Sequence, residues 1–326
     1  MKKGLTLLCC CWGLGVMAQH IFKKTTGLMG SRFELTVVAQ DSASAHGHLD
    51  RAIGEIARIE RLISSWDPRS QTTAINQNAG VAPVTVAPEL YALIARALEI
   101  SKATDGAFDI TYAAMDRLWT FDGTMRVMPS PQAVAASVVK VGYGKVVLHE
   151  AEGSVYLPEK GMKIGFGAIG KGYAADRAKK LLQEAGVRAG IINAGGDMQA
   201  WGKQPNGSDW QVAITNPMDK NKAFALLPIG DRAVVTSGNY EKFVRINGTR
   251  YVHIIDPRTG YPSTGILSVS VFAPKAELAD ALATAIFVMG KEVGLDRVNQ
   301  LPGVECIIID EAGQLATSKN IDIKTL

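Results

Sequence analysis

The stretch that decides the fold runs from Gly161 to Gly202 and reads GMKIGFGAIGKGYAADRAKKLLQEAGVRAGIINAGGDMQAWG. A short apolar run, Met162 to Ile164, predicts a strand, and a turn with four closely spaced glycines follows it. A helical pattern then runs to Gly186, where a helix C-terminus favours a residue with positive φ. Strand, glycine turn, helix and second strand place backbone N–H groups at a helix N-terminus, which suits a phosphate.

Two interpretations of this turn stay open. The segment Gly165-Phe166-Gly167-Ala168-Ile169-Gly170 matches the G-x-G-x-x-G pattern of dinucleotide-binding folds, which is a weak signal by itself. A Rossmann unit would carry an acidic residue at the end of the second strand, whereas Asp197 comes too late and follows another glycine turn. The turn is therefore either a purely structural turn or a contact for a phosphate or diphosphate.

The composition is that of an ordinary globular protein. The chain has 326 residues, of which 47% are hydrophobic and 20% charged, so it is long enough for one large domain or two modest ones. Its formal net charge is only +4, and it contains no long basic run. Nothing in this balance indicates a nucleic-acid partner.

The first 18 residues have the pattern of an export signal. Two lysines precede an apolar stretch from Leu5 to Met17, and Val16-Met17-Ala18 supplies the small side chains of a cleavage site. We therefore expect a signal peptide at 1–18, a mature domain at 19–326 and a periplasmic protein. A lipid anchor on the cysteines at 9 to 11 is less favoured, because Leu8 stands where such signals have a small residue. No later segment has the length of a membrane span.

Periodicity along the rest of the chain predicts a mixed α+β fold. Helical spacing is found at Leu49 to Ile63, from Pro88 onward, after Ser130-Pro131 and at Ala276 to Met289. The polar segment Arg69 to Gly80 is expected to be a loop. The C-terminal part is rich in short strands, with a type I′ hairpin turn at Asn247-Gly248. A largely antiparallel sheet with packed helices fits this order better than alternating βαβ units.

The helix expected at Ala276 to Met289 carries an informative polar side chain. The helix is apolar nearly all round, which predicts burial, yet Asp280 lies within it. An unpaired buried carboxylate costs on the order of several kcal/mol, so a partner must compensate it. Thr284 lies one turn along the same face, and the two side chains together offer oxygen ligands to a hard cation such as Mg²⁺. Pairing of Asp280 with an arginine or with backbone amides is the alternative.

A histidine marks a second candidate position. The segment Tyr251 to Pro262 reads YVHIIDPRTGYP, which predicts a strand followed by a turn, with His253 near the strand end. A lone histidine on a strand is more often structural than catalytic. The residues alone leave its role open.

Several separated motifs, taken together, resemble one family. The strings GAIGKGYAADRA, NAGGD, TSGNYEKF, YVHIIDPRTGYP and ADALATAIFVMG occur in the order typical of the FAD:protein FMN transferases, the ApbE-type flavin transferases. SSWDPRSQTTAIN and GAFDITYAAMDRLW agree in the first half, so the resemblance runs from about Met29 to Cys306. It implies an exported enzyme that binds FAD and Mg²⁺, moves FMN onto a Thr or Ser hydroxyl of a target protein as a phosphoester, and releases AMP.

The resemblance also implies which residues form the site. The metal ligands would be the backbone oxygen of Ala168 with Asp280 and Thr284, and His253 would be the general base. Contacts to the flavin nucleotide would come from Met29, Trp66, Ala107, Phe108, Asp109, Lys171 and Ile254. Gly165 stands at a further nucleotide-contact position, where the family usually has an acid.

Other functions are compatible with the same motifs. An FAD pyrophosphatase would use water in place of the target hydroxyl, and a flavin-binding protein without turnover would be favoured by the missing acid at Gly165. A Rossmann dehydrogenase rests on the glycine pattern alone. The sequence leaves the target protein and the oligomeric state open.

Overall fold

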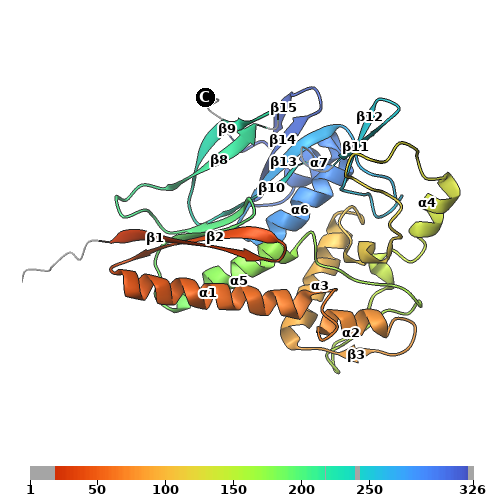
Figure 1. Cartoon of the computed structure of the whole chain (residues 1–326), viewed down its shortest axis with the longest axis horizontal. Coiled ribbons are helices and arrows are strands. Elements are labelled where there is room, and N and C mark those ends of the chain that lie inside the picture. Colours follow the sequence, from red (N-terminus) through yellow and green to blue (C-terminus); the bar gives the residue numbers. More distant parts are fainter. Residues whose placement is uncertain (1–18, 217, 239–242, 322–326) are drawn as a thin grey trace, which may run out of the picture.

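The computed structural model describes residues 19–216, 218–238 and 243–321 (Figure 1). Its frame is an eight-stranded sheet in which every neighbouring pair of strands is antiparallel. In sheet order the strands are β1 (His20–Leu28), β2 (Ser31–Ala39), β6 (Gly190–Ala194), β7 (Asp197–Trp201), β10 (Ala233–Gly238), β13 (Ile266–Ala273), β14 (Glu305–Asp310) and β15 (Leu315–Thr317). The expected α+β class with a largely antiparallel sheet is confirmed, and the parallel sheet of a Rossmann dehydrogenase is not observed.

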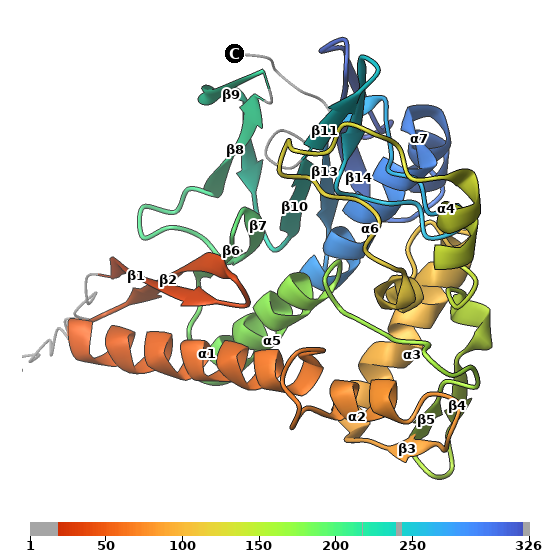
Figure 2. The same cartoon turned by 45° about the vertical axis from the view of Figure 1, so that its right-hand side comes forward.

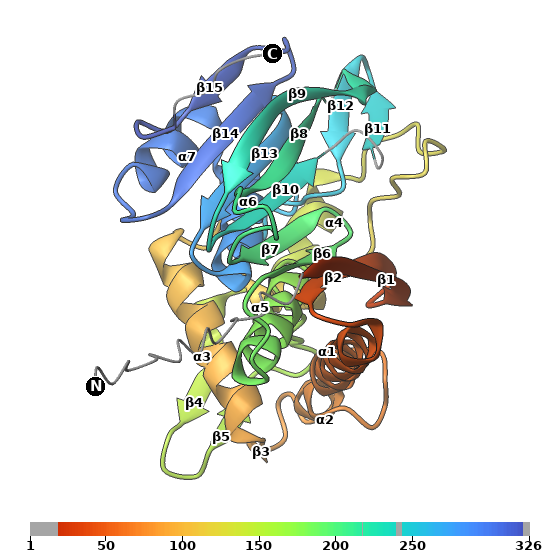
Figure 3. The same cartoon turned by 90° about the vertical axis from the view of Figure 1, so that its left-hand side faces the viewer.

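The two faces of this sheet are covered differently. The helices α1 (Ser42–Ile63), α3 (Pro88–Ala103), α5 (Gly170–Glu184) and α6 (Ala276–Met289) share one buried core with alternate strand residues such as Leu35 and Val37. Figure 2 shows α1 beneath β1 and β2, with α5 running from beside α1 towards α6. Val38, the residue after Val37, belongs to a smaller core on the other face, under the hairpin of β8 (Trp210–Asn216) and β9 (Asp219–Ile229) (Figure 3). This alternation is the period-2 pattern of a strand covered on both faces.

Smaller elements complete the chain. They are α2 (Gln71–Gln77), β3 (Val84–Thr85), η1 (Ile110–Ala114), α4 (Pro131–Ser137), η2 (Tyr143–Lys145), β4 (Val147–His149), β5 (Ser154–Tyr156), β11 (Phe243–Ile246), β12 (Thr249–Val252) and α7 (Lys291–Val298). The predicted hairpin turn between β11 and β12 is confirmed, because Asn247 and Gly248 have φ values of 50° and 82°. Sequence periodicity did not predict α7, β1 or β7.

The helices α5 and α6 meet at a glycine. A Cβ placed on Gly172 would lie 2.2 Å from the carbonyl oxygen of Ala276, so only glycine permits this approach. One turn further along α5, the carboxylate of Asp176 accepts hydrogen bonds of 2.9 Å from the backbone N–H groups of Ala276 and Glu277. A side chain of α5 thus caps the N-terminus of α6 and determines where the residues of α6 lie.

Two expectations for the chain before α5 were wrong. Met162 and Ile164 are buried, but the run Met162 to Ile164 forms no strand, and Arg69 to Gly80 contains α2 rather than only a loop. Asn76 on α2 explains both results, because its side-chain amide donates to the Ile164 oxygen (3.0 Å) and accepts from the Ile164 nitrogen (2.8 Å). One side chain therefore replaces the strand partner that the apolar run would otherwise need. The polar helix begins at a Ser70 cap, whose hydroxyl accepts from the Thr73 N–H.

In the described part of the chain, no helix combines the length and apolar character needed to cross a membrane. The expected signal peptide at 1–18 lies outside the described residues.

Candidate active site

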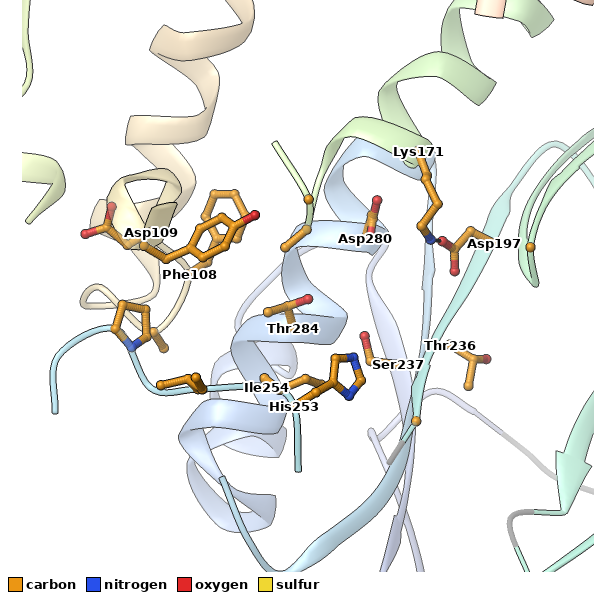
Figure 4. A pocket seen from close by; sticks show the side chains of 18 of the residues that line it. Phe108, Asp109, Lys171, Asp197, Thr236, Ser237, His253, Ile254, Asp280 and Thr284 are labelled. Carbon is orange, nitrogen blue, oxygen red and sulfur yellow. Dashed lines mark ion pairs between the residues drawn. The ribbon is translucent and has the colours of Figure 1, made fainter. Parts of the chain in front are cut away.

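The main candidate site is a cavity of about 510 Å³ beside the glycine turn, a size typical of small-molecule sites. Strand β7 pairs with β10 only at Ala233 and Val234, and the cavity lies where the two strands separate. Figure 4 labels ten of its lining residues: Phe108, Asp109, Lys171, Asp197, Thr236, Ser237, His253, Ile254, Asp280 and Thr284. Elements far apart in the sequence thus bring most of the predicted site residues together.

Among the described residues that line the cavity, Lys171, the second residue of α5, contributes a lysine ammonium group. Its ammonium group forms an ion pair with Asp197, a buried residue at the start of β7 (Figure 4). Asp197 also lines the cavity. The sequence analysis considered Asp197 only as the acidic residue of a Rossmann unit and did not predict its pairing with Lys171. The signal that was present is the string NAGGD, which ends in Asp197. Asp197 holds Lys171 at the mouth of the glycine turn.

Asp280 supplies a buried carboxylate at the same place. Its side chain is 4% exposed, and its Oδ2 accepts a hydrogen bond of 3.1 Å from the Gly172 N–H. Burial raises the pKa of Asp280, while the charge of Lys171 and the Gly172 hydrogen bond act in the opposite direction. Among the described residues no second hydrogen-bond donor binds this carboxylate, which leaves Oδ1 available to a ligand.

The donor atoms around Asp280 fit a magnesium ion. Thr284 follows one helical turn later and lines the cavity, as does Ala168 of the glycine turn. A carboxylate, a hydroxyl and a backbone carbonyl are the hard oxygen donors that Mg²⁺ prefers. The described residues contain no cluster of three or more His, Cys, Asp or Glu side chains suited to a metal. This limited protein donor set suits Mg²⁺ that also binds the phosphates of a substrate.

His253 and Ile254 follow directly after β12 and form the opposite wall. The side chain of His253 is exposed, whereas Ile254 is buried and its carbonyl accepts from the Ser263 N–H. In Figure 4, His253 lies beside Ser237 of β10, with Thr284 on the neighbouring helix. An exposed imidazole at the rim can reach both the cavity and a partner that arrives from solvent.

The loop before η1 contributes Ala107, Phe108 and Asp109. The carboxylate of Asp109 accepts hydrogen bonds from the backbone N–H groups of Thr111 and Tyr143, both at 2.7 Å. Burial raises the pKa of Asp109, and these hydrogen bonds oppose that rise. Asp109 therefore holds the loop in place while it also lines the cavity.

Two of the predicted nucleotide contacts, Met29 and Trp66, line a second, adjoining cavity of about 960 Å³. Trp66 is 78% exposed, and the guanidinium carbon of Arg117 lies 5.2 Å from its ring centroid. Met29 has a φ of 50°, and its N–H donates to Glu60. Among the described residues, both cavities are lined by Tyr112, Met115, Gly167 and Ile255.

Gly165 lines neither of these two cavities. Its N–H donates to the Ile110 oxygen at 2.9 Å, which anchors the start of the turn to η1. A Cβ at this position would lie 3.1 Å from the Ala113 Cβ and 3.5 Å from the Tyr112 hydroxyl. The space next to Gly165 is thus already occupied by η1, and the structure does not bring this predicted residue to the cavity wall.

The antiparallel sheet and the divided cavity beside a glycine turn define an α+β ligand-binding protein of non-Rossmann type. The ApbE family model matches residues 29–308, and the chain belongs to the ApbE family. It is 35% identical over 283 residues to the FAD:protein FMN transferase of Treponema pallidum, covering 82% of this chain and 78% of the relative. A Klebsiella pneumoniae protein of the same name is 32% identical over 292 residues, 89% of each chain.

Solved structures agree with this assignment. The ApbE protein of Thermotoga maritima superposes with a TM-score of 0.83 at 31% identity, covering 92% of this chain and 97% of the other. The flavin transferase ApbE of Vibrio cholerae gives 0.79 at 27% identity, covering 92% and 98%. The expected family and its transferase class are confirmed.

Proposed function

We propose that the protein transfers FMN from FAD to a Thr or Ser hydroxyl of a target protein and releases AMP. The observation that carries this proposal is the meeting of Lys171, Asp280 and His253 in one cavity at a glycine turn. The names of the curated relatives, FAD:protein FMN transferase, support the same reaction.

The two adjoining cavities suit the shape of FAD, which has two ring systems joined by a diphosphate. The glycine turn adjoins both cavities, and its backbone N–H groups at the N-terminus of α5 favour an anion. Lys171 adds a positive charge there. Trp66 offers an exposed aromatic face on which a ring can stack. FAD bound in this way would have its diphosphate next to the reactive side chains.

The reaction then requires positioning and charge neutralisation more than covalent help from the protein. The acceptor hydroxyl oxygen forms a bond to the phosphorus of the FMN half, and the bond from that phosphorus to the bridging oxygen breaks. AMP leaves with the electron pair of that bond, and His253 takes the proton of the hydroxyl. Lys171 and the N–H groups of the turn stabilise the charge on the leaving phosphate.

Asp280, Thr284 and the Ala168 carbonyl would hold Mg²⁺, which when bound supplies positive charge to the diphosphate. The protein prepares this position in advance, because Gly172 and the Asp176 cap fix α6 against α5.

We also propose that the enzyme acts in the periplasm, on a target that is exported or exposed there. The export pattern in residues 1–18 supports this location. Fractionation of cells that express the full chain, with N-terminal analysis of the product, should give a periplasmic protein that begins at Gln19. A cytoplasmic protein with an intact N-terminus would contradict the proposal.

The activity can be tested with the chain from Gln19, FAD, Mg²⁺ and a candidate acceptor domain. We expect AMP in solution and a fluorescent acceptor whose mass has increased by FMN. AMP and free FMN without any acceptor would instead indicate the pyrophosphatase. Tight FAD binding with neither product would indicate a binding protein, and no binding would reject the flavin function.

A matched pair of variants isolates the magnesium dependence. Asp280→Asn keeps an oxygen for the Gly172 N–H but loses the negative charge, so we expect AMP release to fall at least ~100-fold and to stop responding to Mg²⁺. Asp50→Asn, at an exposed position on α1, should behave like the wild type. A Mg²⁺ response in Asp280→Asn equal to that of the wild type would remove Asp280 from the metal site.

A further inference from the structure

Tyr112 lies where the two cavities meet. It lines both of them, together with Met115, Gly167 and Ile255. Of these four residues only Tyr112 carries a strong hydrogen-bonding group in a side chain. A ligand that extends from one cavity into the other therefore passes the Tyr112 side chain.

The phenol of Tyr112 is in close contact with the glycine turn. A Cβ added to Gly167 would lie only 2.5 Å from the phenol oxygen, so the ring fits here because position 167 has no side chain. The backbone N–H of Gly167 interacts with the same oxygen, and the charge of Asp280 acts on it. The hydroxyl is thus located at the turn, close to the buried carboxylate of α6.

The proton of this hydroxyl is available to a ligand. A phenol is protonated at neutral pH, and its oxygen can accept from Gly167 while its O–H donates elsewhere. No side chain or carbonyl in the described part of the protein accepts a hydrogen bond from Tyr112. The turn therefore presents one neutral O–H donor at the junction, in addition to its backbone N–H groups.

We propose that the Tyr112 hydroxyl donates a hydrogen bond to the diphosphate of FAD and makes the site selective for ligands with two linked phosphates. This inference rests on the proposed function, in which FAD is the substrate. A hydrogen bond to an anionic oxygen is stronger than one between neutral groups. At the junction it would also fix the angle between the two halves of FAD, and so align the phosphorus with the attacking hydroxyl.

The test compares ligands that differ in their phosphates. Tyr112→Phe removes one oxygen and keeps the ring that packs on Gly167. At fixed Mg²⁺ we expect its Kd for FAD and for ADP to rise about 10-fold, and its Kd for AMP to change less than about twofold. Tyr91→Phe, on α3 and outside both cavities, is the control and should bind all three ligands like the wild type.

The outcomes separate this inference from the proposed function. Unchanged affinity for FAD and ADP in Tyr112→Phe, while the wild type binds both, would overturn the inference alone. An equal loss for AMP, FAD and ADP would show that Tyr112 acts only through cavity shape, and would also overturn it. A wild type that binds neither FAD nor ADP would overturn both proposals.

A second variant covers the case in which Tyr112→Phe fails to fold. Gly167→Ala places a methyl carbon 2.5 Å from the phenol oxygen, which forces the hydroxyl away while the tyrosine stays intact. The same selective loss of FAD and ADP is expected. If Gly167→Ala folds and binds FAD and ADP as tightly as the wild type, the diphosphate needs no hydroxyl at this position.

Discussion

His253 and Asp280 line the same cavity but differ in their exposure to solvent. Asp280 is buried within α6 and is held by a backbone N–H, whereas His253 is exposed after β12. A metal ligand benefits from a rigid, dry position, but a base that serves a protein substrate must be reachable from solvent. The difference in burial therefore matches the different roles that we assign to the two side chains.

His253→Ala tests the role of the base. We expect the rate of FMN transfer to fall by ~10²-fold or more, the usual contribution of a general base, while the Kd for FAD changes less than about twofold. The checks are the rate of acceptor labelling and FAD binding measured by fluorescence. His149→Ala, on β4 outside both cavities, serves as the control. Loss of FAD binding in His253→Ala would make His253 a ligand contact instead.

The relative position of two side chains could be predicted from the sequence where both lie on one helix or strand. Asp280 and Thr284 could be placed on one face because they lie on one continuous helix. The pairing of Lys171 with Asp197, and the contact of Tyr112 with Gly167, join separate elements. Such neighbours depend on how the sheet and helices pack, and a local pattern does not contain that information.

The contact between α5 and α6 is the element on which the site depends most. Gly172→Ala would place a methyl group 2.2 Å from the carbonyl oxygen of Ala276. This oxygen belongs to the backbone of α6, so it cannot move aside as the end of a flexible side chain could. We expect the free energy of unfolding to fall by about 3 kcal/mol or more and FMN transfer to be lost, because α6 must move away from the turn. Chemical denaturation and AMP release measure the two effects.

A matched glycine in another helix separates this contact from helix propensity. Gly54 lies within α1 and has no atom within 4 Å of an added Cβ. Gly54→Ala should therefore leave activity unchanged and stabilise the protein by up to about 1 kcal/mol. If Gly172→Ala were equally harmless, the close approach of the two helices would be refuted.

Asp176, which caps α6, makes the stability of the folded protein depend on pH. Burial raises the pKa of Asp176 to about 6, above its ordinary value of 3.8, with Glu277 adding to the rise and Lys179 and the two backbone hydrogen bonds opposing it. Between about pH 4 and 6 the folded protein thus retains a proton that the unfolded chain releases. The contribution of Asp176 to stability is therefore largest at the acid end and falls as the pH rises to about 6.

Asp176→Asn removes this titration. The unfolding free energy of the wild type, minus that of the variant, should fall between pH 4 and 7, by at most about 3 kcal/mol. Urea denaturation at several pH values measures the difference. A difference that grows with pH would mean that the N-terminus of α6 stabilises the carboxylate more than burial penalises it.

The helices α1, α3 and α5 were predictable because each buries an apolar stripe along its own length, and α6 was predictable because it is apolar nearly all round. Helix α2 was not, since its sequence QTTAINQ is polar and its stability comes from the Ser70 cap and from the Asn76 contacts with Ile164. The same long-range contacts keep Met162 to Ile164 out of any sheet. Both errors arise where a side chain, rather than a strand, satisfies the buried backbone.

Charged side chains connect three of the helices that pack on the same face of the sheet. Arg58 of α1 contacts Glu55 on its own helix and Glu89 of α3, both at 2.7 Å, and Arg177 of α5 lies 3.2 Å from Glu89. The hydrogen bonds from Arg58 lower the pKa of both glutamates. These partly buried ion pairs hold α1 and α3 against α5, the helix that follows the glycine turn.

One continuous core also underlies both cavities. The main cluster of buried residues runs in sequence from Phe33 to Ile308, and the cavity beside the glycine turn is lined by segments from Ala107 to Thr284. A ligand held there contacts elements from both halves of the chain. We therefore expect one cooperative thermal transition, and a ligand that binds only the folded state should raise its midpoint as a whole.

Thermal unfolding in saturating FAD tests whether the whole chain unfolds in one transition. At a free concentration of 100 times Kd the folded state gains about 2.7 kcal/mol, which for a chain of this size corresponds to a rise in Tm of about 4 °C. Riboflavin, which has no phosphate for Lys171 or the glycine turn, should raise the Tm much less at the same concentration. A melt in two steps, with only one step shifted by FAD, would show that the two halves of the chain unfold separately and that the ligand contacts only one of them.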